Sequence, residues 1–286
     1  SSGNELILDN SYIDSSNTSG ITNNGTLTLN NANTINKAVT GEGTTSVNGA
    51  LTLGADLTQN TLNIANTGSI ANTSNTITVN SSGSNAGSIT GAGTFALGEN
   101  ASYTNTGSIT HGTVNISENA VLTNSNAVTV STSGTNSGTI TGNGTFTNNG
   151  TYTNNGTISQ SSIENTGSLT SSASNLTSTA GITNTGDLYL NAGTTQSNIS
   201  GTNGTTHITG AVTLANTITD NIISLDDTGT LKMGVTDITS ANKLIADGGY
   251  LNMQTQSGAQ TYNLGDIDLK SSIAMAIDID LTGGSG

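Results

Sequence analysis

Aliphatic residues alternate with hydroxyl residues in short stretches along most of the chain. Residues 27–29, 77–79 and 128–130 each read aliphatic, Thr, aliphatic. Because successive side chains of a β-strand point to opposite faces, this pattern predicts strands of four or five residues with an aliphatic face and a hydroxyl face. Strands this short are marginal by themselves, so the pattern also predicts that they stack on one another.

A repeated phrase sets the period of the stacking. It reads Asn-x-Gly, then one residue, then an aliphatic residue, and several neighbouring copies lie about 19 or 20 residues apart. A second phrase, Thr-Gly-x-Gly-Thr, begins at Thr40, Thr90 and Thr141, with a spacing of roughly 50 residues. The copies of the first phrase begin at Asn23, Asn66, Asn85, Asn105, Asn136, Asn154, Asn165 and Asn184.

These periods predict an all-β fold, a right-handed parallel β-helix (β-solenoid) with coils of about 20 residues. Each strand then pairs in parallel with the same strand of the next coil, about 4.8 Å away. We divide the chain into low-complexity Asn/Gly/Thr-rich coils over 1–210, a continuation with better-filled coils over 211–282, and a linker-like tail at 283–286.

The repeated Asn residues allow two interpretations. Asn is a common turn former because it tolerates left-handed backbone and bonds to its own backbone. Asn side chains at equivalent positions of stacked coils also form ladders, in which amides hydrogen-bond along the axis. The sequence leaves both interpretations open.

Composition and charge narrow the classes of function. Hydrophobic residues make up 31% of the chain and aromatic residues 3%, which suits a narrow core, and the absence of Pro suits stacked strands. The chain has no Cys, and its net charge is −14. With no Arg and four Lys, at Lys37, Lys232, Lys243 and Lys270, it lacks the basic surface that nucleic acid or anionic lipid requires. No run of about eighteen apolar residues predicts a membrane span, and we expect any secretion signal to lie outside these residues.

The C-terminal strings resemble a known family. Residues 212–214, 229–234, 249–253, 262–269 and 277–281, together with the Asn-x-Gly and Thr-Gly-x-Gly-Thr coils, resemble the last coils of bacterial autotransporter passengers, which include β-helical surface adhesins. The resemblance implies a secreted protein, extracellular at the bacterial cell surface, delivered through an outer-membrane barrel. The tail at 283–286 departs from the family pattern, in which the barrel follows.

Few residues offer chemistry. His111 and His207 have no second His near them in sequence, and we expect both to be exposed on loops or strand faces. Two acidic pairs share a strand face because their members are two residues apart: Asp266 with Asp268, and Asp278 with Asp280. Such a pair could hold Ca²⁺. We expect both pairs instead to lie on a solvated outer face. We assign no catalytic, cofactor-binding or metal residue, and we expect no enzymatic activity.

Three functions are compatible with these observations. The leading one is a non-catalytic adhesin or structural surface rod that binds a host or bacterial surface glycan or protein. Lateral self-association through the uncharged outer Thr, Asn and Ser of 20–210 is a further expectation. The alternatives are a carbohydrate-processing β-helix enzyme and, third, an ice-binding solenoid. The third is prompted by the pairs Thr26/Thr28, Thr76/Thr78, Thr145/Thr147 and Thr151/Thr153, which we do not expect to share one position in every coil.

Overall fold

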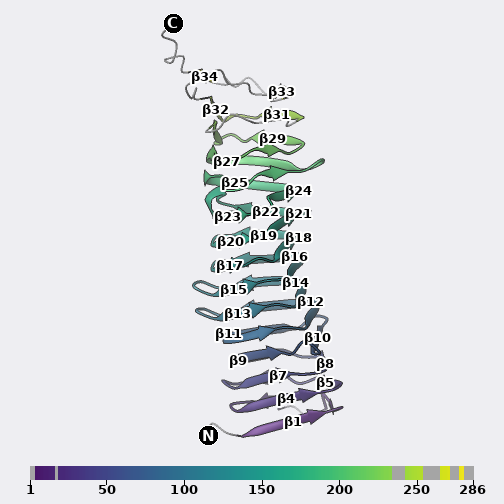
Figure 1. The fold of residues 1–286 in the computed structure, drawn as a ribbon. Helices are drawn as coiled ribbons and strands as arrows, with labels where there is room; N and C mark the ends of the chain where they lie inside the picture. Colours follow the sequence, from purple (N-terminus) through teal and green to yellow (C-terminus); the bar gives the residue numbers. More distant parts are fainter. Residues whose placement is uncertain (1–3, 17–18, 234–241, 254–264, 271–276, 280–286) are drawn as a thin grey trace. The chain divides into compact units, whose positions relative to one another are not determined.

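The fold is an all-β solenoid of stacked parallel strands (Figure 1). The computed structural model describes residues 4–16, 19–233, 242–253, 265–270 and 277–279. Its strands form about 13 turns of about 19 residues each, slightly shorter than predicted, and the described residues contain no α-helix. The predicted parallel β-solenoid is therefore confirmed, while Asp280 and the tail at 283–286 lie outside the described residues.

The chain divides into two compact units, residues 1–151 and 152–286, which are described separately. The strands of the first unit pair in register from coil to coil, as in the series Ser69, Ser88, Ser108 and Ala127. These strands are β1 (Glu5–Asp9), β2 (Tyr12–Ile13), β3 (Ile21–Thr22), β4 (Thr26–Asn30), β5 (Asn33–Ile35), β6 (Val39–Thr40), β7 (Thr44–Val47), β8 (Ala50–Leu53), β9 (Leu57–Ile64), β10 (Ser69–Asn72), β11 (Thr76–Asn85), β12 (Ser88–Leu97), β13 (Ser102–Asn105), β14 (Ser108–Ile116), β15 (Val121–Asn124), β16 (Ala127–Asn136), β17 (Thr139–Thr141) and β18 (Thr145–Asn148).

The second unit repeats the same pairing. Leu188 of one coil pairs with Thr206, and Thr206 pairs with Ile223. Strand β27 runs through the predicted change of character at residue 210, so the solenoid continues across it. After β19 (Thr151–Asn154), at the boundary, the elements are β20 (Thr157–Gln160), β21 (Ser162–Asn165), β22 (Ser168–Ser171), the short 3₁₀ helix η1 (Ala173–Asn175), β23 (Leu176–Ser178), β24 (Ile182–Asn184), β25 (Asp187–Thr194), β26 (Ile199–Ser200), β27 (Thr205–Leu214), β28 (Ile218–Thr219), β29 (Ile222–Leu225), β30 (Thr230–Met233), β31 (Lys243–Ala246), β32 (Tyr250–Met253), β33 (Asp266–Leu269) and β34 (Ile277–Ile279).

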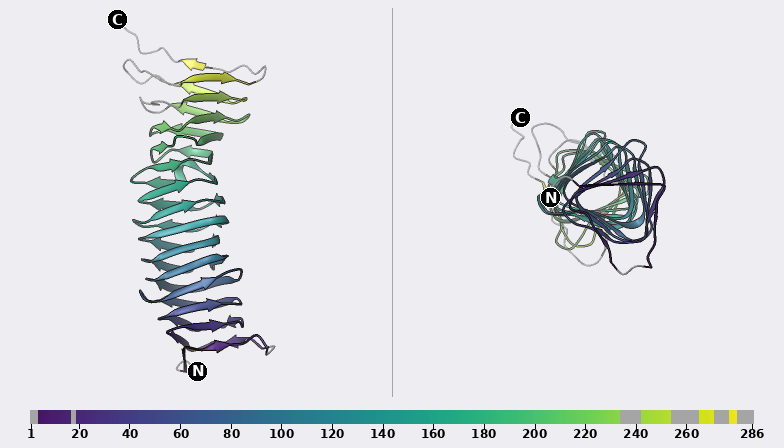
Figure 2. Two further views of the ribbon diagram at one scale, coloured as in Figure 1. Left: turned by 90° about the vertical axis from the view of Figure 1, so that its right-hand side faces the viewer. Right: turned by 90° about the horizontal axis from the view of Figure 1, so that it is seen from below.

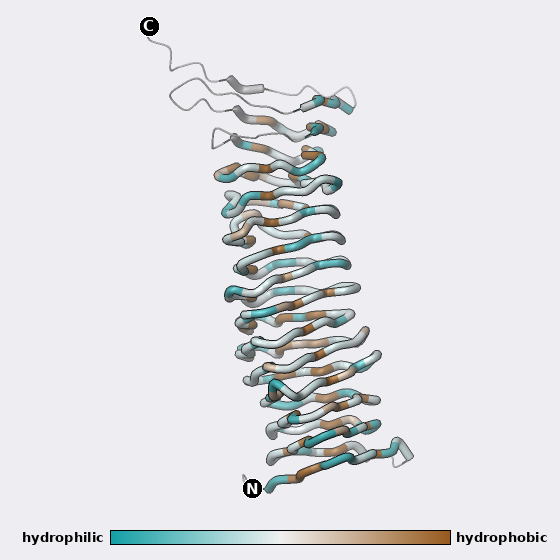
Figure 3. The backbone as a smooth tube through the Cα atoms, turned by 45° about the vertical axis from the view of Figure 1, so that its right-hand side comes forward, coloured by the Kyte–Doolittle hydropathy of each residue, from teal (hydrophilic) through white to brown (hydrophobic). Residues whose placement is uncertain are grey.

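The core of each unit is the narrow space that its coils enclose. Figure 2, on its right, views the coils end on, and the backbone runs around a central space. The aliphatic side chains that alternate along each strand point into this space and stack on the residues at the same position of the next coil. Leu27, Thr45 and Leu62, for example, occupy the same inward position in three successive coils and are all buried. Hydrophobic positions accordingly recur at similar places in successive coils (Figure 3). Only four aromatic side chains are fully buried in the described core: Phe95, Tyr103, Phe146 and Tyr152.

Buried Asn residues form ladders beside the aliphatic core. In the first unit the amide of Asn85 donates to Oδ1 of Asn105, and the amide of Asn105 donates to Oδ1 of Asn124, both at 2.8 Å. In the second unit Asn165 donates to Asn184 at 2.8 Å. Oδ1 of Asn85 also accepts from the backbone N–H of Gly87 at 3.1 Å. The same side chain therefore forms the turn and the ladder, so both interpretations of the Asn-x-Gly phrase hold.

The Thr-Gly-x-Gly-Thr phrase makes a corner, which lies between strands at Gly41 and Gly142 and at a shift of register within β12 at Gly91. Its first glycine has a positive φ of 118° at Gly41, 135° at Gly91 and 121° at Gly142, a conformation that residues with a Cβ rarely adopt. Its second glycine lies against the preceding coil. In the third copy of the phrase, the N–H of Gly144 donates to the carbonyl of Asn124 in that coil at 2.9 Å. A side chain at Gly144 would meet the backbone of Asn126.

Candidate functional site

The outward residues of the first unit form uncharged columns along the axis. We define face A as the outer face of β4, β7, β13, β15, β17 and the C-terminal halves of β9 and β11. Its outward positions carry hydroxyl side chains at all but two places. In order along the axis they are Thr26 and Thr28, Thr44 and Ser46, Thr61 and Asn63, Ser82 and Ser84, Ser102 and Thr104, Val121 and Thr123, and Thr139 and Thr141.

Face B is a second such face, formed by β8, β10, β18 and the N-terminal halves of β12, β14 and β16. One of its columns is almost entirely Thr, and the other contains Ser, Ala and Thr. The first column is Thr52, Ala71, Thr90, Thr110, Thr129 and Thr147; the second is Ala50, Ser69, Ser88, Ser108, Ala127 and Thr145.

Carboxylates are kept out of both faces. Glu42, Asp56, Glu99 and Glu118 are exposed and lie in the turns between strands of the first unit. The coil faces therefore present neutral hydroxyl groups, and the acidic charge of this unit lies at its corners and in its first coil.

The predicted Thr pairs do not share one position. Thr26/Thr28 lies on face A, Thr145/Thr147 on face B, and Thr76/Thr78 on the N-terminal half of β11, which belongs to neither. However, the register continues each pair into hydroxyl residues of neighbouring coils, as from Thr26 and Thr28 to Thr44 and Ser46. The hydroxyl columns are longer than the pairs alone indicated.

His207 and Tyr189 form a side-chain cluster on the outer surface of the second unit. Their rings stack with centroids 4.3 Å apart and planes inclined by 10°, because Tyr189 and His207 pair in register on β25 and β27. Nε2 of His207 lies 3.4 Å from Oδ1 of Asp187, and its Nδ1 lies 3.6 Å from Oδ1 of Asp226. Ser224 donates to the same oxygen of Asp226 at 3.0 Å.

The surroundings of Tyr189 change the pKa of its phenol. Partial burial raises the pKa of its phenol, and the negative charges of Asp187 and Asp226 raise that pKa further. His207 lies on a strand face, as predicted, but its side chain is half-buried, with 20% exposed, because it stacks on Tyr189. The cluster itself was not predicted, because it depends on the register between coils.

His111 contradicts the expectation of exposure. Its side chain is completely buried, and Nδ1 lies 2.9 Å from the carbonyl oxygen of Gly93. Nε2 is buried without a hydrogen-bond partner. The reason is the alternation of β14, which places Ile109 inside, Thr110 outside and His111 inside. Burial lowers the pKa of His111, and the hydrogen bond to Gly93 opposes this effect.

The predicted acidic pairs are only partly described. Asp266 and Asp268 both lie on β33, as predicted, and Oδ2 of Asp268 lies 2.7 Å from Nζ of Lys243. This ion pair lowers the pKa of Asp268. Asp278 lies on β34, opposite Asn252. In the parts of the chain that the structure describes, no three His, Asp or Glu side chains gather closely enough to hold a metal ion.

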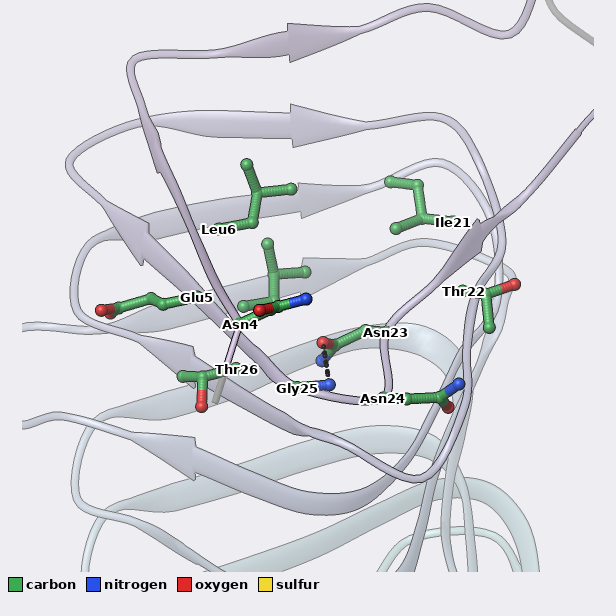
Figure 4. A pocket seen from close by; sticks show the side chains of 10 residues that line it. Asn4, Glu5, Leu6, Ile21, Thr22, Asn23, Asn24, Gly25 and Thr26 are labelled. Carbon is green, nitrogen blue, oxygen red and sulfur yellow. Dashed lines mark hydrogen bonds between the residues drawn. The ribbon is translucent and has the colours of Figure 1, made fainter. Parts of the chain in front are cut away.

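The first coil holds a depression of about 370 Å³. It is lined by residues 4–6 and 21–27, and Figure 4 shows the side chains of Leu6 and Ile21 beside it. In Figure 4 the side chain of Asn23 accepts a hydrogen bond from the N–H of Gly25, at 3.2 Å. The described residues contain no helix with the length and apolar character needed to cross a membrane.

Comparisons with protein-family models, with curated proteins and with solved structures found no match to this chain.

Proposed function

We propose that this protein is a secreted bacterial cell-surface β-solenoid that acts as an adhesin or a structural surface protein and does not catalyse a reaction. The observation that carries the proposal is the pair of uncharged hydroxyl faces A and B, held in register over successive coils. Such faces offer many hydrogen-bonding groups at a lower desolvation cost than charged groups. The resemblance of the sequence to autotransporter passengers supports the location.

The partner that we propose is a glycan or protein on a host or bacterial surface. Many weak contacts along repeated coils add up to useful avidity, and neither face needs a deep pocket. Lateral association of two copies through the same faces is a related mode. At physiological salt the screening length is about 8 Å, so repulsion between copies with a net charge of −14 is limited to short range.

Binding to glycan arrays, to bacterial and host cells and to immobilised protein tests this function. Two matched variants report on the faces: Thr110→Lys with Thr129→Lys on face B, and Thr104→Lys with Thr123→Lys on face A. We expect one pair to abolish binding and the other to leave it intact, because a partner covers one face. Absence of binding by the wild-type chain to every surface, or turnover of a polysaccharide by the purified chain, would overturn the proposal.

Ice binding is a second candidate, favoured by the Thr column of face B. Thr110 and Thr129 are β-branched residues with restricted rotamers, on a ladder whose spacing of about 4.8 Å is fixed by strand pairing. A rigid array of this kind is what a crystalline surface of water requires. Ser and Ala at most positions of the neighbouring column weaken this candidate. Thermal hysteresis of the wild type, lost in the face B variant, would establish it.

A further inference from the structure

A stacked pair of rings stands out from the outer face of the second unit. Tyr189 on β25 and His207 on β27, two strands that lie next to each other in Figure 1, share an outward column in which Thr170 precedes them and Ser224 follows. Because the two rings stack from coil to coil and are longer than Thr and Ser, they form a ridge across this column. We call it the Tyr189–His207 ridge. The ring face of Tyr189 that His207 does not cover looks over the shorter Thr170, and Tyr189 is only half-buried.

Two carboxylates are held at the edge of the ridge. Oδ1 of Asp187 lies 3.4 Å from Nε2 of His207, and Oδ1 of Asp226 lies 3.6 Å from Nδ1 of the same ring and accepts a hydrogen bond from Ser224. Both carboxylates remain accessible to solvent. Partial burial, and then the charges of Asp187 and Asp226, raise the pKa of the Tyr189 phenol, which therefore keeps its proton. The edge of the ridge thus offers acceptor oxygens in fixed positions beside a phenol that donates.

An open depression adjoins the ridge at Asp226. Its volume is about 300 Å³, and its other lining residues are Thr209, Asp227, Thr228 and Asp247. The hydroxyl of Thr228 donates to the carbonyl of Thr209 at 3.0 Å, so the turn that forms one wall is held against the preceding coil. The ridge and the depression together leave room for a ligand longer than a single ring.

We propose that the Tyr189–His207 ridge binds one ring of a neutral glycan. A pyranose ring has an apolar face of C–H groups and a rim of hydroxyl groups. Its C–H face packs on the uncovered face of Tyr189, above Thr170, because the face of an aromatic ring is apolar and electron-rich. A hydroxyl group of the same sugar donates to Asp187 in a charge-assisted hydrogen bond, and further sugars of the chain reach Asp226 and the depression. This site lies in the second unit and does not depend on faces A and B of the first.

The charges around the ridge favour a neutral sugar over a charged one. A uronic or sialic acid would bring a further carboxylate towards Asp187 and Asp226, which would repel it. A cation would be attracted, but each of these carboxylates already faces a nitrogen of His207, and a cation would have to displace that contact. The oxygen atoms that remain accessible accept hydrogen bonds from hydroxyl groups at no such cost.

Saturation-transfer NMR of the full chain with matched sugars tests the ligand class. The probes are the methyl glycosides of glucose, galactose and mannose, each compared with its uronic acid and its 2-amino counterpart. We expect at least one neutral glycoside to bind with a Kd of about 1–10 mM, as a ligand of about a dozen heavy atoms allows, with the strongest saturation at C–H protons of one ring face. Its uronic acid should bind about threefold more weakly. Absence of binding by all three neutral glycosides, or tighter binding of a charged counterpart, would overturn the proposal.

Variants of Tyr189 test the place of binding. Tyr189→Phe keeps the ring and should retain the affinity for the preferred glycoside within about threefold, whereas Tyr189→Leu keeps an apolar side chain without a flat face and should weaken binding about tenfold. The matched control is Tyr250→Leu, which should change nothing, because Tyr250 is exposed in the same unit but lies on β32, outside the ridge. Equal affinities of the Phe and Leu variants at Tyr189, or an equal loss in Tyr250→Leu, would contradict the proposal. The Lys variants of faces A and B should bind the glycoside normally, so failure here leaves the proposed function standing.

Discussion

The side-chain amide of Asn85 donates a hydrogen bond of 2.8 Å to Oδ1 of Asn105, its equivalent one coil later. Both side chains are completely buried. A buried amide without partners costs about 1–3 kcal/mol, so the ladder stabilises the coils chiefly because each amide satisfies the next. Loss of one member removes one buried hydrogen bond from the neighbour on each side.

Replacement of Asn105 by Ala should therefore destabilise the first unit strongly. Asn105 accepts from Asn85 and donates to Asn124 and to the carbonyl of Ala127, at 2.8 Å and 3.1 Å. We expect a loss of about 2 kcal/mol or more in the free energy of unfolding, measured by urea denaturation. The matched control is Asn66→Ala, since Asn66 begins the same phrase but is exposed, and its loss should stay within about 0.5 kcal/mol. Equal effects of the two variants would show that the turn, and not the ladder, provides the stability.

A buried phenol in the core offers a stabilising substitution. Tyr103 is fully buried with its ring 5.4 Å from that of Phe95, and its hydroxyl has no hydrogen-bond partner. Burial raises the pKa of this phenol far above its usual value, so it remains neutral. Tyr103→Phe keeps the ring packing and removes the unsatisfied group, and should raise the free energy of unfolding by about 1 kcal/mol. Tyr12→Phe, at an exposed position, should change nothing; a destabilised Tyr103→Phe would indicate a partner for the hydroxyl.

Local patterns were sufficient to predict the coils, and insufficient wherever side chains of different coils meet. The alternation around Leu27 and the Asn-x-Gly period are properties of neighbouring residues, so they predicted strand faces and parallel stacking. Alternation from Ile109 would also have placed His111 inside, and the error came from applying the general exposure of His instead. The Tyr189–His207 stack depends on how many residues separate two coils. The insertion or deletion of one residue between β25 and β27 would turn His207 to the other face of its strand. The alternation within a single strand gives no information on this spacing.

The buried His111 makes the first unit sensitive to acid. Its pKa is lowered in the folded state because burial disfavours the charged imidazolium, whereas the unfolded chain titrates near 6.5. Stability is therefore complete above about pH 6.5 and is lost as the pH falls through that value towards the folded pKa. The protection factors of the amides of β12, β14 and β16 against hydrogen exchange should therefore fall between pH 7 and pH 5.5. His111→Gln should remove this dependence and His207→Gln should retain it; the opposite pattern would exclude His111 as the cause.

The second unit contains a buried carboxylate in the position of a ladder amide. Asp220 is completely buried, and its Oδ2 accepts from the amide of Asn184 at 2.6 Å and from the hydroxyl of Thr206 at 2.8 Å. Its Oδ1 has no hydrogen-bond partner. Desolvation raises the pKa of Asp220, and the hydrogen bonds from Asn184 and Thr206 oppose that rise without cancelling it.

Asp220→Asn should consequently stabilise the protein at neutral pH. With a folded pKa above the unfolded value, the carboxylate costs stability at pH 7, and the cost disappears as the pH falls through the folded pKa. The amide keeps an acceptor oxygen for Asn184 and Thr206 and carries no charge. We expect a gain of about 1–3 kcal/mol in the free energy of unfolding at pH 7, shrinking towards pH 4. Asp227→Asn, at an exposed position of the same unit, serves as the control for net charge. If Asp220→Asn destabilised the chain as much as Asp220→Ala does, the carboxylate would have a partner that stabilises its charge.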